Sequence, residues 1–352
     1  MLRMPPQKYL MYISQNYSYA MLRPIQSAIL ARGGSVKWFL EGKEVSDKYL
    51  LNDEIQLNTV EEVNQWGADF VLVPGNVVPS FIKGIKVGLF HGFNSGKRGN
   101  DAHFKIRQCF DMYCTQGPNT TQRFLKLAEQ YQTFTVKETG WAMLDPLFTV
   151  VEANPYRIQG DNRPTILLCS TFSAETSYAD ELFPTIKQLS QSPEYRWLVQ
   201  FHPKMPADIV EKYKAIQNEN LQFIETDDVI PLLQASDLMI CDTSSIMIMF
   251  LLQKKPVIAY KNKTTNDSFI HIDNVNDLDK TIVQALNSSE QLLNKIDLYC
   301  SQTHPYSDGQ SSSRVVEACE RLKKEGIENI KPKPLNLIRQ LKLRKKLKYW
   351  KI

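Results

Sequence analysis

The chain has 352 residues, 43% of them hydrophobic and 23% charged, a composition typical of a globular protein long enough for two domains. No apolar run reaches the roughly 20 residues that span a bilayer, and the N-terminus lacks the apolar core of a signal peptide, so we expect a cytoplasmic protein. The six cysteines form no CxxC pair and have no His at zinc spacing, which argues against a disulfide framework and a zinc site.

The net charge of +4 is distributed unevenly. Residues 331–352 contain nine Lys or Arg and no Asp or Glu, which leaves −5 for the rest of the chain. This tail alternates Leu, Ile, Tyr and Trp with basic residues, a composition suited to an anionic membrane surface. Its apolar positions do not gather into one helical stripe, so a disordered, solvated end is an alternative. Nucleic-acid binding is less favoured, because the body of the protein is net acidic.

The first 155 residues are expected to form one α/β lobe. A strand over residues 8–13, a helix over 19–32 that stops at Gly33-Gly34, and a strand over 36–40 make up a βαβ unit. Helical stretches separate several of the short apolar runs that follow. These further predicted strands cover residues 70–73, 84–90, 112–115 and 134–136.

A second lobe is expected to begin after a polar, proline-containing passage at residues 154–164. Because strands and helices alternate in both halves, the sequence predicts an α/β protein with two Rossmann-like lobes, at residues 1–155 and 156–330, followed by the basic tail at 331–352. The strands predicted in the second lobe cover residues 166–169, 197–201, 222–224, 238–241 and 256–260.

Polar residues that could act in catalysis or bind a ligand follow several of these strands. In open α/β sheets, ligands bind beyond the carboxyl ends of the strands. His91, His202 and the pair Ser170-Thr171 all occupy such positions. An imidazole with a pKa of ~6.5 can accept a proton at cellular pH, so either histidine is a candidate base. The alternative for each is a histidine that only makes local hydrogen bonds.

A four-residue polar turn, Asp242-Thr243-Ser244-Ser245, lies between the strand at 238–241 and an apolar helix at 246–252. Such a turn can direct hydroxyls and backbone N–H groups at an anion, which the positive end of the helix dipole also favours. The turn is therefore a candidate phosphate site, with an ordinary helix cap as the alternative.

Neither a metal nor a cofactor is expected. Asp277 and Asp279 have the spacing of a metal-binding pair, but they precede a helical stretch at 281–286. Capping of that helix and its dipole explain the two carboxylates more simply.

The order and spacing of the motifs in this chain resemble those of the CDP-glycerol glycerophosphotransferase family, the teichoic-acid primases and polymerases. The fold of this family is of the GT-B type. Members carry Trp-His-Gly followed by Lys, Gly-x-Pro-x-x-Asp, His-Pro, Asp-Tyr-Ser-Ser and Asp-Gly-x-x-Ser. The corresponding stretches here are Phe90-His91-Gly92 with Lys97, Gly140 to Asp145 without the central Pro, His202-Pro203, Asp242 to Ser245, and Asp308 to Ser312.

The resemblance implies that an acceptor hydroxyl attacks the phosphorus nearer the glycerol of CDP-glycerol, and that CMP leaves. It implies His91 as the general base in an acceptor-side first lobe, and His202 as the residue that stabilises the leaving group in a donor-binding second lobe. The implied donor-binding residues are Thr171, His202, Asp242, Ser244, Ser245, Asp308 and Ser311. Lys97 and Asp145 are candidate contacts to the acceptor or a phosphate.

Two departures from the family pattern leave the substrate open. Met249 stands where members often have an acidic residue, and Phe90 replaces the Trp. Donors with ribitol phosphate or another polyol phosphate are therefore alternatives to CDP-glycerol. The acceptor is expected to be lipid-linked or a polysaccharide, and the enzyme to lie on the inner face of the cell membrane.

Three other functions remain open at this point. A GT-B glycosyltransferase would bind a nucleotide sugar in the same kind of cleft. A UDP-N-acetylglucosamine 2-epimerase shares the fold and a segment like Pro305 to Gly309, but its paired glutamates are absent after Cys241. A non-catalytic scaffold held at the membrane by the tail would not need His91 or His202.

Overall fold

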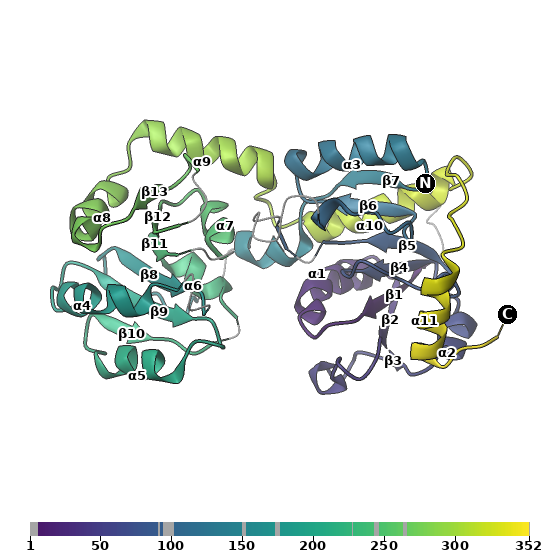
Figure 1. Ribbon diagram of the computed structural model, residues 1–352, viewed down its shortest axis with the longest axis horizontal. Coiled ribbons are helices and arrows are strands. Elements are labelled where there is room, and N and C mark those ends of the chain that lie inside the picture. Colours follow the sequence, from purple (N-terminus) through teal and green to yellow (C-terminus); the bar gives the residue numbers. More distant parts are fainter. Residues whose placement is uncertain are drawn as a thin grey trace. The chain divides into compact units, whose positions relative to one another are not determined.

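The computed structural model describes residues 6–90, 92–93, 102–149, 153–172, 177–226, 228–242, 246–262 and 266–351 (Figure 1). The chain forms two compact units. Unit 1 comprises residues 1–146 and 303–352, and unit 2 comprises residues 147–302.

Unit 1 is built on a parallel sheet in which the described strands follow the order β3-β2-β1-β4-β5-β6-β7. Its strands are β1 (Lys8–Ile13), β2 (Ser35–Leu40), β3 (Gln56–Leu57), β4 (Phe70–Val73), β5 (Ile85–Gly88), β6 (Met112–Thr115) and β7 (Thr135–Glu138). Its helices are α1 (Ser18–Ala31), α2 (Val60–Trp66), α3 (Pro118–Tyr131), α10 (Ser311–Glu325) and α11 (Leu337–Leu347).

Unit 2 repeats this architecture with the strand order β10-β9-β8-β11-β12-β13, also parallel. Its strands are β8 (Thr165–Ser170), β9 (Arg196–Phe201), β10 (Leu221–Phe223), β11 (Leu238–Cys241), β12 (Val257–Tyr260) and β13 (Ile270–Ile272). Its helices are α4 (Ala179–Leu189), α5 (Ala207–Ala215), α6 (Ile230–Ala235), α7 (Ile246–Leu251), α8 (Leu278–Leu286) and α9 (Glu290–Thr303).

The predicted α/β class with two Rossmann-like lobes is confirmed. Every residue of β4, β8, β11 and β12 is buried. Helices cover parallel sheets on both faces, so such strands need apolar side chains at successive positions and not only at alternate ones. This explains why the central strands are continuous apolar runs in the sequence.

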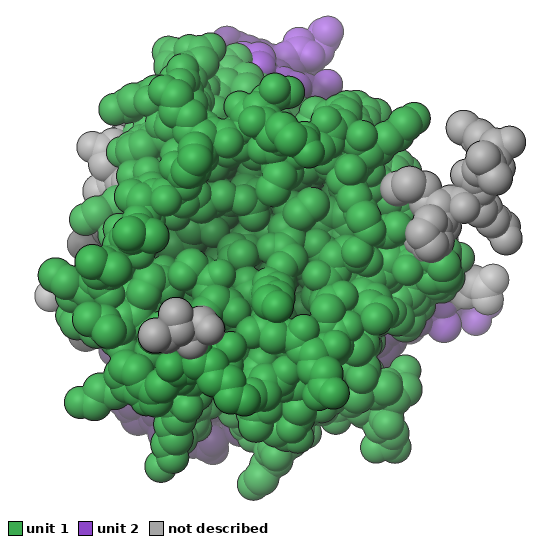
Figure 2. Space-filling view, turned by 90° about the vertical axis from the view of Figure 1, so that its right-hand side faces the viewer, with its two compact units in different colours: residues 1–146, 303–352 green, residues 147–302 purple. Residues whose placement is uncertain are grey.

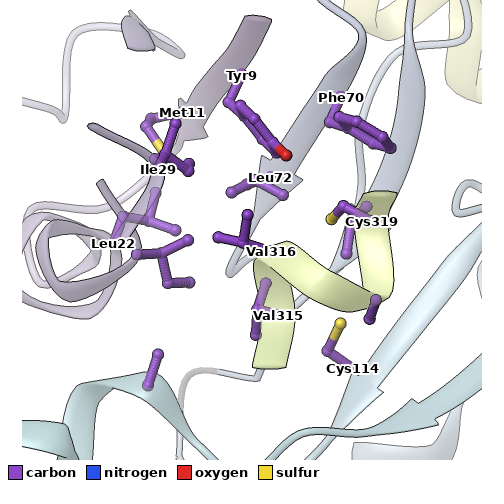
Figure 3. Close-up of a cluster of buried hydrophobic side chains, with 14 of the residues drawn as sticks. Tyr9, Met11, Leu22, Ile29, Phe70, Leu72, Cys114, Val315, Val316 and Cys319 are labelled. Atoms are coloured by element: carbon purple, nitrogen blue, oxygen red, sulfur yellow. The ribbon is translucent and has the colours of Figure 1, made fainter. Parts of the chain in front are cut away.

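Helix α10 belongs to unit 1, whereas the sequence-based boundary at residue 330 placed it in the second lobe. Its buried residues Val315, Val316, Cys319 and Leu322 lie on one helical face. They pack in one core cluster with residues of β1, β4 and α1. Figure 3 shows Val315, Val316 and Cys319 in this cluster. The sequence predicts the apolar face of this helix but not the sheet that covers it.

Asp145 fixes the beginning of α10. It lies in a 3₁₀ helix at Ala142–Phe148, and its side chain is buried. Its Oδ1 accepts a hydrogen bond from the backbone N–H of Ser311 (2.8 Å), and its Oδ2 accepts one from the N–H of Ser312 (2.8 Å). The carboxylate thus satisfies two unpaired N–H groups and the positive end of the helix dipole. Asp145 was predicted to contact the acceptor or a phosphate. In the structure, both of its carboxylate oxygens cap α10.

The basic tail forms helix α11, which packs on unit 1 (Figure 1). Leu343 is buried, and Leu347 and Tyr349 pack against the apolar cluster of the sheet. Lys346 Nζ lies 2.7 Å from a carboxylate oxygen of Glu41. The guanidinium of Arg344 lies 4.7 Å from the ring centroid of Phe81. Over residues 331–351 the tail is thus docked, in contrast to the disordered end considered from the sequence.

The other face of α11 exposes Leu337, Ile338 and Leu341, with Lys342 and Lys345 also exposed. Helix α11 lies at the right of Figure 1. Figure 2 shows unit 1 from that side. The apolar residues of the tail are therefore divided between a docked face and an exposed face, which explains why they form no single stripe. None of the described helices has the length and apolar character needed to cross a membrane.

Asp145→Ala should lower the free energy of unfolding by about 2 kcal/mol, because two buried N–H groups at the start of α10 lose their acceptor. Urea unfolding followed by circular dichroism measures the change. The matched control is Asp308→Ala. Asp308 accepts from the N–H of Gln310 at the same helix start, but its side chain is half exposed. We expect the control to cost less than about 1 kcal/mol, and equal losses would contradict the assigned cap.

Candidate functional site

The carboxyl edge of the unit 2 sheet contains a switch point between β8 and β11. These strands are neighbours, and the chain leaves them toward opposite sides of the sheet. In doubly wound sheets, nucleotides bind in the crevice at this point. Two predicted donor-binding residues lie here, Thr171 after β8 and Asp242 after β11. Ser170, which precedes Thr171, ends β8.

Asp242 joins the ends of three strands. The Thr171 backbone N–H donates to its Oδ1 (3.0 Å), and the Ser170 hydroxyl donates to its Oδ2. The Asn262 side chain, beyond β12, donates to the Asp242 carbonyl oxygen (3.1 Å). Asp242 is only 1% exposed. The structure thus brings the predicted residues Thr171 and Asp242 together, with the carboxylate holding the edge of the sheet. Ser244 and Ser245 lie outside the described residues.

His202 directly follows β9, and it is exposed. Its Nδ1 accepts a hydrogen bond from the backbone N–H of Lys204 (3.1 Å). In the neutral ring, this places the proton on Nε2. Partial burial, followed by the charge of Lys204, lowers the pKa of His202 below its usual value. The neutral, exposed imidazole can therefore donate a hydrogen bond to an anion. Its ring also packs on Phe172, with 4.3 Å between centroids.

In unit 1, the ends of β5 and β7 are connected through Trp141. Its indole N–H donates to the carbonyl oxygen of Phe90 (2.8 Å), and its backbone N–H donates to His304 Nε2 (2.9 Å). Phe90 immediately precedes the predicted base, His91. His91 and Lys97 themselves lie outside the described residues.

Gly140 makes this arrangement possible. Its φ of +80° lies in the left-handed region, which favours glycine. A Cβ atom there would lie 2.4 Å from the Ser311 hydroxyl and 3.0 Å from His304 Nε2. Any larger residue would therefore displace the segment that carries Trp141, which gives a physical reason for the glycine in the motif at 140–145.

A second polar cluster lies at the ends of β6 and β7. Glu138 accepts hydrogen bonds from the hydroxyls of Tyr306 (3.1 Å) and Thr121 (2.5 Å). The guanidinium of Arg314 stacks on the Tyr306 ring at 4.1 Å and forms an ion pair with Asp308. The predicted donor residue Asp308 thus lies in unit 1 and is paired with a cation.

The predicted site residues are therefore divided between the two units. Thr171, His202 and Asp242 lie together in unit 2, whereas Asp308 and Ser311 lie in unit 1 with Asp145. Within the ranges that the structure describes, no group of three or more His, Cys, Asp or Glu side chains could hold a metal ion. Sequence reasoning missed Trp141 and His304 as a linked pair, although the sequence His304-Pro305 repeats the motif noted at His202-Pro203.

A protein-family model matches the central part of the chain. The model, described as CDP-Glycerol:Poly(glycerophosphate) glycerophosphotransferase, matches residues 97–268. This stretch contains Thr171, His202, Asp242, Ser244 and Ser245. No curated protein matches the chain.

Solved structures share the fold over most of the chain. The wall teichoic acid polymerase TagF is 14% identical and gives a TM-score of 0.63 over 92% of this chain and 90% of its own. A TagF variant soaked with CDPG is 14% identical, with a TM-score of 0.59 over 93% and 91%. A candidate UDP-N-acetylglucosamine 2-epimerase from Listeria monocytogenes is 17% identical, with a TM-score of 0.66 over 91% and 98%. The fold is thus GT-B-like and common to both classes of enzyme.

His304 should make the protein less stable as the pH falls. Burial lowers the pKa of its imidazole to about 4, and its Nε2 can accept from Trp141 only while unprotonated. The unfolded state, with a pKa of ~6.5, binds a proton that the folded state excludes, so stability falls from pH ~6.5 to pH ~4 by up to about 3 kcal/mol. Urea unfolding across this pH range measures the effect. His304→Gln keeps an acceptor without this titration and should flatten the dependence, and identical slopes in both proteins would contradict the assignment.

Proposed function

We propose that the chain, whose residues 97–268 match the CDP-glycerol:poly(glycerophosphate) glycerophosphotransferase family model, belongs to this family. It then transfers a polyol phosphate from a CDP-activated donor to a hydroxyl group and releases CMP. Glycerol phosphate is the proposed transferred group, and the acceptor is a lipid-linked or polysaccharide chain in cell-surface synthesis. The observation that carries the proposal is the family match, which spans the switch point of unit 2. The TagF structure soaked with CDPG supports a donor of this type.

In this proposal, unit 2 binds the donor. The diphosphate lies beyond the ends of β8, β9 and β11, where His202 Nε2–H donates to it. Thr171, Ser244 and Ser245 supply further donors, and the positive end of α7 faces the anion. Asp242 acts indirectly, since its carboxylate accepts from the backbone of Thr171 and fixes that loop.

The proposed reaction is a substitution at phosphorus. The acceptor oxygen forms a bond to the glycerol-side phosphorus while the bond from that phosphorus to the bridging oxygen breaks. The electron pair of the broken bond leaves with CMP, and the acceptor proton passes to His91. His202 stabilises the charge that develops on the departing phosphate.

His202→Ala should weaken the binding of CDP-glycerol by about tenfold or more, because a hydrogen bond to a charged group is lost. His202→Gln keeps an N–H donor and should retain part of the affinity. Calorimetric titration with CDP-glycerol, CMP and UDP-N-acetylglucosamine measures the three ligands under one set of conditions.

His271→Ala is the control for this experiment. His271 is a second histidine of unit 2, and it lies on β13 next to Asp273 and away from the switch point. We expect the control to bind as the wild type does. Preference for the uridine sugar over both cytidine ligands would contradict the proposed donor and favour a sugar-transferring enzyme.

The exposed face of α11 supports a proposed attachment to the inner face of the cell membrane. Leu337 and Ile338 are 65% and 74% exposed, and nearby Leu335 and Trp350 are also largely exposed. Lys342 and Lys345 accompany them. Apolar side chains beside lysines fit the boundary between acyl chains and anionic headgroups. Contact through this face leaves the docked residues of the helix in place.

Replacement of Leu337, Ile338 and Leu341 by Gln should weaken binding to phosphatidylglycerol vesicles by about tenfold or more, with the fold unchanged. Vesicle co-sedimentation at low salt measures the affinity, and added salt should weaken the wild type. These substitutions are preferable to removal of the tail, which would leave buried Glu41 without Lys346.

The control for the vesicle experiment is the pair Leu293→Gln and Leu298→Gln. Both residues are exposed leucines of α9 in unit 2. This variant should bind vesicles as the wild type does. Unchanged binding by the α11 variant would exclude this face as the attachment surface.

A further inference from the structure

The backbone carbonyls on both sides of His91 accept hydrogen bonds from buried side chains. The Trp141 indole N–H donates to Phe90 (2.8 Å), and the Gln116 side-chain amide donates to Gly92 (3.2 Å). Phe90 follows β5, Gln116 follows β6 and Trp141 follows β7, so three neighbouring strands contribute. Because a carbonyl oxygen can only accept, these contacts fix which end of the Gln116 amide faces Gly92.

Trp141 is itself held from two directions. Its backbone N–H donates to His304 Nε2 (2.9 Å). Its ring meets Phe93 edge to face, with 5.1 Å between centroids, and Phe93 also contacts the His304 ring at 6.4 Å. The described residues on each side of His91 are therefore connected to one aromatic group.

Gln116 is difficult to explain as a stabilising residue of the fold. It is only 1% exposed, and its Oε1 has no hydrogen-bond partner among the described residues. Its surroundings are mainly apolar, and include Met21, Ile25 and Leu89. A buried acceptor without a partner costs free energy of folding, which an apolar side chain of the same shape would not. An apolar residue at this position could not donate the hydrogen bond to the Gly92 carbonyl oxygen.

We propose that Gln116 and Trp141 are positioning residues for the proposed base, His91, because they hold the backbone carbonyls of the residues on either side of it, Phe90 and Gly92. This inference rests on the proposed function, in which His91 is the base. Neither residue touches the reacting atoms in this scheme. Their effect is on geometry, to which proton transfer is sensitive because base and hydroxyl must lie within hydrogen-bond distance.

Gln116→Met tests the proposal, since methionine has a similar length and no donor. We expect the variant to be at least as stable as the wild type in urea. We expect kcat for CMP release from CDP-glycerol, with a lipid-linked glycerol phosphate acceptor, to fall by about tenfold to a hundredfold. The KM for CDP-glycerol should change little, because unit 2 binds the donor in the proposed scheme.

Thr133→Val is the matched control. Thr133 is a buried residue of unit 1 that precedes β7, and its hydroxyl also has no hydrogen-bond partner among the described residues. The substitution removes a similar polar group and should leave kcat within about twofold of the wild type. A comparable fall in kcat in both variants would mean that any change in this core lowers activity, which would overturn the specific role of Gln116.

A readout independent of turnover separates this inference from the proposed function. In protein labelled with ¹³C-histidine, the ring signal of His91, assigned with His91→Asn, should shift or broaden in Gln116→Met while that of His202 stays in place. A superimposable His91 signal would overturn the inference. A changed signal in a protein whose wild type releases no CMP from CDP-glycerol would support the positioning role and reject the proposed reaction.

Discussion

The return of the chain to its first sheet is the constraint on which unit 1 depends. Val315, Val316, Cys319 and Leu322 of α10 complete a core whose other members come from the first half of the sequence. The buried carboxylate of Asp145 fixes where that helix begins. The same return brings His304 to Trp141, so the packing of the core and the hydrogen bond that holds the Trp141 backbone have a common origin.

The two units stabilise the carboxyl edges of their sheets in different ways. In unit 2, the charged side chain of Asp242 connects the ends of β8 and β11, and its carbonyl oxygen accepts from a residue beyond β12. In unit 1, neutral donors from Gln116 and Trp141 hold backbone carbonyls. A carboxylate near a diphosphate would repel it if it were exposed. In unit 2 the Asp242 carboxylate is instead buried against N–H and O–H donors, which suits an edge where we propose that an anion binds.

Much of the fold could be predicted from the sequence, because buried parallel strands leave a strong apolar pattern. Every strand predicted from the sequence has a counterpart in the structure, whereas β3 and β13 were missed. Both are short, and β13 includes His271, so neither has a distinct apolar run. The partner of α10 could not be predicted, because an amphipathic helix shows which face is buried and not what covers it. The same limit applied to α11, whose apolar residues serve two surfaces.

From the sequence, candidate site residues can be proposed only where a residue type suggests its own chemistry. His202 and Thr171 follow strands and have the polar groups expected of a phosphate site. Gln116 follows a strand equally closely, yet an uncharged amide gives no catalytic signal, and its contact to Gly92 depends on the neighbouring strand. In the structure, Asp145 caps a helix and Asp308 pairs with Arg314. The sequence alone does not distinguish carboxylates with such structural contacts from carboxylates that contact a ligand.

The discontinuity of unit 1 also determines the order in which the protein can form during its synthesis. Unit 2 is one uninterrupted stretch, residues 147–302, and can close as soon as it leaves the ribosome. The N-terminal sheet emerges first but lacks α10 until about 180 residues later, a delay of roughly 10 to 40 seconds at typical rates of elongation. During that interval its apolar surface has no permanent cover. Nascent chains of this protein should therefore need protection by chaperones at their beginning, even though their middle is already folded.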